Sequence, residues 1–299
     1  MPTQPASAPR PSRLTRRAFL GACGGGVLGL GAAALYARYV EPSWVELARL
    51  DMELPGLAPE WSGRGLVHIS DLHVPGHDSP HLRRQLRRCT ELAPDLIVIT
   101  GDFVSGCDPS EIRELAHVLP LLQARLGVVA VLGNHDFNLG RPLSAPAPVS
   151  NCVQGVLEDA GVRVLRNAFH LVELPNAPGA SLQIVGLDEW WTRRTDAEAA
   201  FADVDAHQPC IALVHNPDAY AVLCDRACHW ILCGHTHGGY VRIPLLGAPI
   251  LPVENRRFDA GLFRLGAQRL YVNRGLAPGR VRFNCRPEIT LFTLSPRRK

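Results

Sequence analysis

Five places along this chain carry side chains that bind metal ions, and each directly follows an apolar run. The runs are LVHIS, DLIVIT, VVAVL, CIALV and HWILC, which are short and β-branched, as is typical of strands buried on both faces. The side chains that follow them are Asp71, His73, Asp102, Asn134, His135, His215, His235 and His237. Carboxylate, carboxamide and imidazole together indicate divalent transition metals such as Mn, Fe, Zn or Ni, rather than Ca²⁺ or an iron–sulfur cluster.

The ends of these strands are expected to bring the side chains together. In sheets with helical crossovers, polar residues placed where buried strands end face a common crevice. Gly101, Gly133 and Gly234 each stand immediately before a metal-binding residue, where a missing side chain permits a sharp turn or a close approach to an ion. We therefore expect these glycines to belong to the site.

Helical and strand patterns alternate between the motifs. Helices are predicted at Pro80–Leu92 and Glu111–Leu126, because each has an apolar stripe on one side. Further strands are predicted at Val162–Leu165, Ser181–Val185, Leu262–Leu265, Leu270–Val272 and Ile289–Leu294. The sequence therefore predicts an α/β fold in which helices cover sheets.

The order D-x-H, GD, GNHD, H and GHTH resembles the calcineurin-like metallophosphoesterase family, from about Leu66 to the C-terminus. Each motif alone is weak, whereas five in order are specific. The resemblance implies an α/β (α+β) fold, a four-layer sandwich of two mixed β-sheets flanked by helices. GHTHGGYVRIP and YVNRGLAPGRVRFNCRPEITLFTL are similar to the exported or membrane-associated phosphodiesterase subgroup.

The resemblance also implies roles for single residues. Asp71, His73, Asp102 and His237 would hold one ion, and Asp102, Asn134, His215 and His235 the other, with Asp102 bridging. Two adjacent ions ionise a shared water and clamp the oxygens of an in-line displacement at phosphorus. His135 would serve as general acid and charge stabiliser.

Two positions depart from the family pattern. Ser105 stands where many members have an Asp that orients the catalytic His, so an imidazolium at His135 would be less stabilised unless Asp108 or Asp136 takes that role. Tyr240 stands where Gln is usual, which would alter only the substrate pocket. We also expect a loop containing His77 and His81 to overhang the metals, and the remaining histidines outside the motifs to be structural.

Residues 1–40 are predicted to form a separate leader. Arg10, Arg13, Arg16 and Arg17 precede an uncharged stretch at 18–37, and TRRAFL at 15–20 resembles a twin-arginine export signal. A membrane anchor is the alternative, because about 20 uncharged residues can span a bilayer. Either reading makes the export machinery or the membrane a partner. It also places the domain outside the cytoplasm, in the periplasm or anchored to the membrane.

Length and charge describe the remainder of the chain. Residues 41–299 are expected to form one domain. The net charge is +3, but residues 1–40 contain five arginines and no acids, which leaves −2 for the rest and argues against nucleic-acid binding.

The nine cysteines show no C-x-x-C pair, so buried thiols are the expectation, with Cys224–Cys228 and Cys107–Cys152 as alternative bridges.

The predicted activity is binuclear-metal-dependent hydrolysis of a phosphoester, most specifically by a phosphodiesterase acting on a cell-envelope or other extracytoplasmic substrate. One alternative is a UDP-diacylglucosamine pyrophosphohydrolase of lipid A synthesis, a cytoplasmic step that the leader disfavours. Another is a non-catalytic scaffold of the same fold, which the complete set of ligand positions disfavours.

Overall fold

The computed structural model describes residues 27–106, 108–138, 146–277 and 281–296, and two six-stranded sheets organise them. The first sheet has the order β1-β12-β2-β3-β4-β5. Its strands are β1 (Glu46–Leu54), β2 (Gly65–Ile69), β3 (Leu96–Thr100), β4 (Val128–Val131), β5 (Val162–Val164) and β12 (Glu288–Pro296). β2, β3, β4 and β5 are parallel, and β12 joins them antiparallel to β2, so the sheet is mixed.

The second sheet has the order β10-β11-β9-β8-β7-β6. Its strands are β6 (Ala168–Leu174), β7 (Ala177–Gly186), β8 (Cys210–Leu213), β9 (Trp230–Cys233), β10 (Gly261–Leu265) and β11 (Gln268–Val272). The four central strands are parallel, while β6 and β10 pair antiparallel at the two edges. Both sheets therefore have a buried parallel centre, which explains the unalternating apolar runs.

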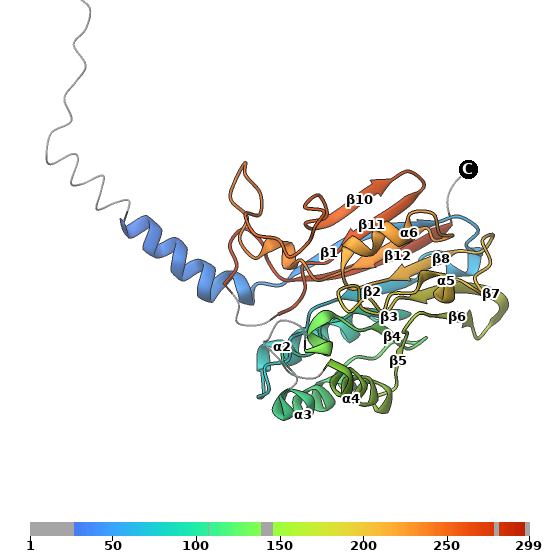
Figure 1. Cartoon of the computed structure of the whole chain (residues 1–299), viewed down its shortest axis with the longest axis horizontal. Helices are drawn as coiled ribbons and strands as arrows, with labels where there is room; N and C mark the ends of the chain where they lie inside the picture. Colours follow the sequence, from blue (N-terminus) through green and yellow to red (C-terminus); the bar gives the residue numbers. More distant parts are fainter. Residues whose placement is uncertain (1–26, 107, 139–145, 278–280, 297–299) are drawn as a thin grey trace, which may run out of the picture.

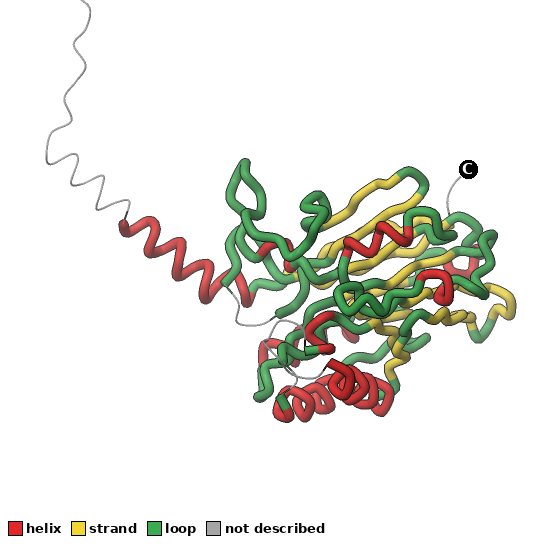
Figure 2. Tube along the Cα trace, in the orientation of Figure 1, coloured by secondary structure: helices red, strands yellow, loops and turns green. Residues whose placement is uncertain are grey.

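Helices cover the outer face of each sheet (Figures 1 and 2). The helices are α2 (Pro80–Glu91), α3 (Pro109–Val118), α4 (Pro146–Asp159), α5 (Ala197–Ala200) and α6 (Tyr220–Leu223). One apolar cluster joins α2, α3 and α4 to the first sheet, a second fills the space between the sheets, and a third joins α5 and α6 to the second sheet. The four-layer α/β sandwich is thus confirmed.

Most predicted elements form, with some different bounds. The helix predicted at Glu111–Leu126 is wrong at both ends. It begins at Pro109 because Asp108 caps it, and it ends at Val118 because Pro120 cannot continue an α-helix. β1 and β6 were not predicted from the sequence. Both alternate polar and apolar residues and are partly exposed, unlike the central strands.

The chain enters the sandwich through a helix. Residues 27–35 are α-helical and continue into the π-helix η1 (Tyr36–Val40). No helix within the described ranges is both long and apolar enough to cross a bilayer. The twin-arginine-type segment at 15–20 lies outside those ranges, and the division of the chain at residue 40 stays a prediction.

The described cysteines carry free thiols. Cys224 is exposed and Cys228 is buried, and the proposed bridge between them is not formed. Burial raises the pKa of Cys228 to about 12, so this thiol behaves as a small apolar group. The alternative bridge from Cys152 involves Cys107, which lies outside the described residues.

Candidate metal centre

The metal-binding side chains stand at the carboxyl ends of parallel strands from both sheets. Asp71 and His73 follow β2, Asp102 follows β3, Asn134 and His135 follow β4, His215 follows β8, and His235 and His237 follow β9. β2, β3 and β4 are parallel in one sheet, and β8 and β9 are parallel in the other. All these residues except His135, which is partly exposed, are buried.

Five of these residues have a left-handed backbone. Their φ angles are 52° at Asp71, 42° at His73, 56° at Asp102, 70° at His235 and 50° at His237. Each such conformation costs a residue other than glycine roughly 1–3 kcal/mol, and it persists only where surrounding packing enforces it. The strain is therefore concentrated in the loops that aim the metal-binding groups.

Glycines permit the loops to approach one another. A Cβ atom at Gly133 would lie 2.2 Å from Oδ1 of Asp102, and one at Gly234 would lie 1.8 Å from the hydroxyl of Ser70. Neither position can hold a larger residue without moving these groups. This agrees with the expectation that the glycines before the metal-binding residues belong to the site.

A first cluster contains Asp71, His73, Asp102 and His237, whose ligand atoms all lie within 4.8 Å of one another. Nε2 of His237 is 3.3 Å from Oδ1 of Asp71, and Nε2 of His73 is 3.5 Å from Oδ2 of Asp102. These two carboxylates and two imidazoles match the first set that the sequence assigned.

A second cluster contains Asp102, His215 and His235, again with ligand atoms within 4.8 Å. Oδ1 of Asn134 joins it, 2.8 Å from Nδ1 of His235 and 3.1 Å from Nε2 of His215. Asp102 belongs to both clusters, because its Oδ2 lies 3.2 Å from Nε2 of His215 as well as close to His73. It would be the ligand shared by two ions if both clusters were occupied.

Backbone carbonyl groups orient two of the imidazoles. Nδ1 of His215 lies 2.6 Å from the carbonyl oxygen of Thr100, and Nε2 of His235 lies 2.8 Å from that of Pro252. The ring nitrogen on the carbonyl side carries the proton, so the other nitrogen is left as a lone-pair donor facing the cluster. His215 therefore presents Nε2 and His235 presents Nδ1 to the same ligand cluster.

The electrostatics of the clusters favour cation binding. Burial alone would raise the pKa of Asp102, but the facing His215 holds it well below its usual range. Burial alone would lower the pKa of His215, but Asp102 raises it to about 10. Burial lowers the pKa of His235 to about 3 and that of His237 well below its ordinary value. His235 and His237 are therefore neutral beside the ionised Asp102, as metal binding needs, whereas the proton that His215 shares with Asp102 would have to leave when an ion binds.

The geometry fits two divalent ions. Oδ1 of Asp71 is fully buried and has no hydrogen bond from any described residue, although it faces the imidazole of His237. A buried carboxylate oxygen in this situation is costly unless a cation satisfies it. The mixed nitrogen and oxygen donors of both clusters suit transition metals. The site is therefore consistent with the expected binuclear metal centre, and the identity of the metals stays a prediction.

His135 lies beside the first cluster, with its ring centroid 4.8 Å from that of His73. Nδ1 of His135 contacts the backbone carbonyl of Ser105 at 2.8 Å, and the hydroxyl of Ser105 contacts Nδ1 of His73 at 3.1 Å. A backbone carbonyl therefore contacts Nδ1 of His135, and a role for Asp108 or Asp136 in supporting this histidine stays a prediction. Asp108 caps α3, and Asp136 accepts hydrogen bonds from backbone N–H groups, including those of Asp102 and Phe103.

A cavity of about 400 Å³ opens onto the metal-binding groups. Its lining includes Trp191, Tyr240 and Pro252, which the sequence motifs did not assign to metal binding or catalysis. The ring of Trp191 meets that of His235 edge-on at 4.5 Å between centroids. His77 and His81 are absent from the described lining. The sequence placed Tyr240 at the substrate pocket, and the Trp190–Trp191 pair in a polar loop is a further sequence signal that could have indicated this wall.

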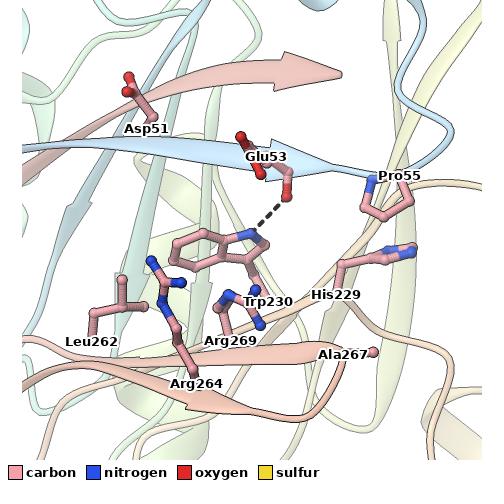
Figure 3. Close-up of a pocket in the computed structure, with 9 residues that line it drawn as sticks. All are labelled: Asp51, Glu53, Pro55, His229, Trp230, Leu262, Arg264, Ala267 and Arg269. Carbon is pink, nitrogen blue, oxygen red and sulfur yellow. Dashed lines mark hydrogen bonds between the residues drawn. The ribbon is translucent and has the colours of Figure 1, made fainter. Parts of the chain in front are cut away.

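A second hollow, which we call the Trp230 cleft, has a volume of about 220 Å³ (Figure 3). It lies between β1 and the β10–β11 hairpin, and the indole nitrogen of Trp230 donates to the carbonyl of Glu53 at 3.0 Å. Its lining contains Asp51, Glu53, Pro55, His229, Trp230, Leu262, Arg264, Ala267 and Arg269. None of these residues belongs to the two clusters.

The fold and the buried centre define a binuclear metallohydrolase of the phosphoesterase type. The model of the calcineurin-like phosphoesterase family matches residues 65–239, and the chain belongs to that family. The protein is therefore a metal-dependent phosphoric ester hydrolase.

Relatives extend the similarity over almost the whole chain. The uncharacterized metallophosphoesterase YkuE of Bacillus subtilis is 31% identical over 94% of this chain and 98% of its own length. The phosphodiesterase YaeI of Escherichia coli is 31% identical over 94% and 99%. The UDP-2,3-diacylglucosamine pyrophosphatase LpxG of Chlamydia trachomatis is 30% identical over 86% and 92%. Similarity at this level supports a shared reaction type and leaves the substrate to experiment.

Proposed function

We propose that this protein is a phosphodiesterase that acts on a cell-envelope phosphoester outside the cytoplasm. The observation that carries the reaction type is the carboxylate of Asp102, which is shared between two buried ligand clusters. Resemblance to the phosphodiesterase YaeI supports the preference for diesters. The basic leader followed by uncharged residues supports the location.

In this proposal, Asp71, His73, Asp102 and His237 hold one ion, and Asp102, Asn134, His215 and His235 hold the other. Two bound ions would supply an ionised water and neutralise charge on the phosphoryl oxygens. His135 stands at the cavity wall, and its Nδ1 is fixed by the carbonyl of Ser105. Its Nε2 can therefore donate a proton to the leaving oxygen or stabilise phosphoryl charge.

The deciding experiment is a substrate panel. The full chain would be purified, stripped, reloaded with Mn, Fe, Zn or Ni, and assayed on matched phosphomonoesters and phosphodiesters. We expect higher kcat/KM for diesters, and stripped protein as the matched control should be inactive. Preference for monoesters, or activity without metal, would contradict the proposal.

A second candidate is hydrolysis of a UDP-diacylglucosamine pyrophosphate bond, which the similarity to LpxG favours. This reaction uses the same attack on phosphorus, so the metal centre does not distinguish the two candidates. The location does, because that substrate is a cytoplasmic intermediate. Including the pyrophosphate substrate in the panel compares the candidates directly.

The export proposal depends on Arg16 and Arg17. A twin-arginine signal is read by a receptor, so Arg16→Lys with Arg17→Lys should retain the protein in the cytoplasm although the charge is unchanged. Cell fractionation measures this, with Arg10→Lys and Arg13→Lys as the matched control. Unchanged extracytoplasmic location of the Arg16/Arg17 variant would indicate a simple membrane anchor.

A further inference from the structure

An apolar cavity of about 440 Å³ lies beside the metal cavity and shares Tyr240 and Pro252 with it. The rest of its described lining is Thr236, Gly239, Val241, Pro249, Ile250 and Val281. The hydroxyl of Thr236 donates to the carbonyl of Asp259 at 2.6 Å, so it is already satisfied. Such a lining offers a ligand apolar contact and few hydrogen bonds.

Tyr240 connects this apolar cavity to the metal centre. Its ring stacks on that of His237, with centroids 4.4 Å apart and planes 19° apart. Its backbone has φ of 59°, a conformation that a bulky residue adopts only under constraint. A substrate whose phosphoester lies at the metal centre can therefore place a substituent past Tyr240 in the apolar cavity.

A turn with leucines at its tip lies in the chain between the lining residues Val241 and Pro249. Leu245 is completely exposed, and Leu246 and Ile250 are 80% and 78% exposed. The N–H groups of Leu246 and Gly247 both donate to the carbonyl of Ile243, and Leu245 has φ of 69°. Glycine or asparagine is the ordinary residue at such a position. Leucine side chains that face water bury no apolar surface and so do not stabilise the turn. Their presence at the tip points to an apolar environment around the turn.

The same end of the molecule carries the N-terminal helix, drawn in blue, and the orange loop that contains this turn (Figure 1). Hydrogen bonds tie the two together through the segment at 281–285. The N–H of Arg282 donates to the carbonyl of Ala37 at 2.9 Å, and the N–H of Arg242 donates to the carbonyl of Phe283 at 2.9 Å. The helix forms the last part of the uncharged stretch at 18–37. Its residues Leu28, Leu30 and Leu35 are exposed.

Aromatic and cationic side chains follow directly after this helix. Arg38 lies over the ring of Tyr39 at 5.3 Å, and Arg286 lies over the ring of Trp44 at 4.6 Å. Tyr39 is 66% exposed and Trp44 is 55% exposed. Exposed tyrosine and tryptophan paired with arginine are typical of the level where a membrane meets water.

We propose that the turn at Leu245–Leu246, together with Ile250, enters the bilayer beside the N-terminal helix. The apolar cavity then takes the hydrocarbon chain of a membrane lipid whose phosphoester lies at the metal centre. This inference rests on the proposed function and names the substrate class. A hydrocarbon chain is the occupant that matches the apolar lining, the exposed leucines and the neighbouring helix together.

Depth-dependent fluorescence quenching tests the docking surface and needs no enzymatic activity. Leu245→Trp and Leu246→Trp would be made in the full chain and bound to phosphatidylglycerol vesicles with brominated acyl chains. The emission added by the new tryptophan should fall roughly twofold or more. Leu171→Trp on β6 is the matched control, because Leu171 is 38% exposed on a distant edge strand, and its added emission should stay. Unquenched tryptophan at both turn positions would overturn the docking surface.

Competition with a soluble diester tests the cavity. Hydrolysis of bis(p-nitrophenyl) phosphate would be inhibited by dihexanoylphosphatidylglycerol below its micelle concentration and by glycerophosphoglycerol, which has the same headgroup without chains. The chain-bearing compound should inhibit roughly tenfold or more strongly. Val281→Asp should abolish this ratio, whereas Leu171→Asp should preserve it.

Equal inhibition of the unsubstituted protein by both compounds would overturn the lipid assignment while leaving a phosphodiesterase intact. Failure to hydrolyse any phosphoester in the metal-loaded state would instead contradict the proposed function. The quenching result decides the docking surface in either case.

Discussion

The metal cavity and the Trp230 cleft contain similar kinds of side chain but hold them differently. The cleft has two carboxylates, Asp51 and Glu53, together with His229 and a tryptophan (Figure 3). Both carboxylates are exposed, because they occupy alternate positions on β1 with the buried Met52 between them. Solvent and the nearby arginines can satisfy them without a metal ion.

At the metal centre the carboxylates of Asp71 and Asp102 are buried, and they stand on loops with left-handed backbone. Two groups with metal-binding geometry occur in the part of the chain that the structure describes, and both are here. The difference teaches that residue composition does not make a metal site. Burial and the convergence of strand ends create a metal site, because they leave charged groups that only a cation can satisfy.

The comparison predicts its largest effect at Asp102. Asp102→Ala should remove the carboxylate shared by both clusters, so the protein should lose both ions, about two per chain in the unsubstituted form. Activity should fall by more than the roughly 10²–10³-fold that loss of one electrostatic stabiliser costs. Elemental analysis and kcat/KM measure this, and Asp51→Ala is the matched control. A variant that keeps both ions would show that Asp102 is not the bridge.

A smaller but still large effect is predicted at His135. His135→Ala should lower kcat roughly 10²–10⁴-fold while metal content stays the same, because the imidazole is a proton donor and not a ligand. The loss should shrink for substrates whose leaving groups need no proton. His229→Ala in the Trp230 cleft is the control. An equal loss on all leaving groups would make His135 a charge stabiliser only.

His68 tests whether burial alone, without a metal-binding role, has a measurable cost. Its side chain is buried between the sheets, Nε2 contacts the hydroxyl of Thr100 at 2.9 Å, and burial lowers its pKa to about 3. The unfolded chain, with an ordinary histidine pKa, then binds more protons between pH 3 and 6.5, so stability should fall as the pH falls through this window.

From pH 7 to pH 5 this histidine should cost roughly 2 kcal/mol of unfolding free energy. His68→Gln should remove that part of the pH dependence, as measured by urea unfolding at both pH values. The exposed His207→Gln is the control. The same pH dependence with and without His68 would place the acid sensitivity elsewhere, for example in the metal-binding residues.

The sequence was sufficient to predict those parts of the fold and the site in which the local residue pattern agrees with the environment in the folded protein. The central strands are apolar on both faces, and the residues at their ends are types that bind metals, so Asp71, Asp102 and His215 could be assigned without coordinates. β1 was missed although alternation of apolar and polar residues is typical of a half-buried strand, because the prediction relied on unalternating apolar runs and the partner β12 lies more than 200 residues away in the sequence.

The partner of His135 could not be predicted because it is a main-chain atom. The carbonyl of Ser105 is present whatever the side chain at that position, so no residue type signals it. Asp136, which the sequence offered for this role, binds the N–H groups of the loop after β3. The apolar cavity beside Tyr240 was invisible for a similar reason, since it forms from loops that meet only after folding.

The smallest effect is predicted in the Trp230 cleft, and it could break the comparison. Asp51→Asn with Glu53→Gln removes both carboxylates while keeping their shape. Because both are exposed and neither belongs to a ligand cluster, metal content and kcat/KM should stay as in the unsubstituted protein. Stability should change by no more than about 0.5 kcal/mol, the usual range for surface substitutions. Metal analysis, steady-state kinetics and urea unfolding of the double variant check this. A loss of bound metal or activity would mean that exposed carboxylates on an edge strand contribute to the centre, and burial would no longer separate the two regions.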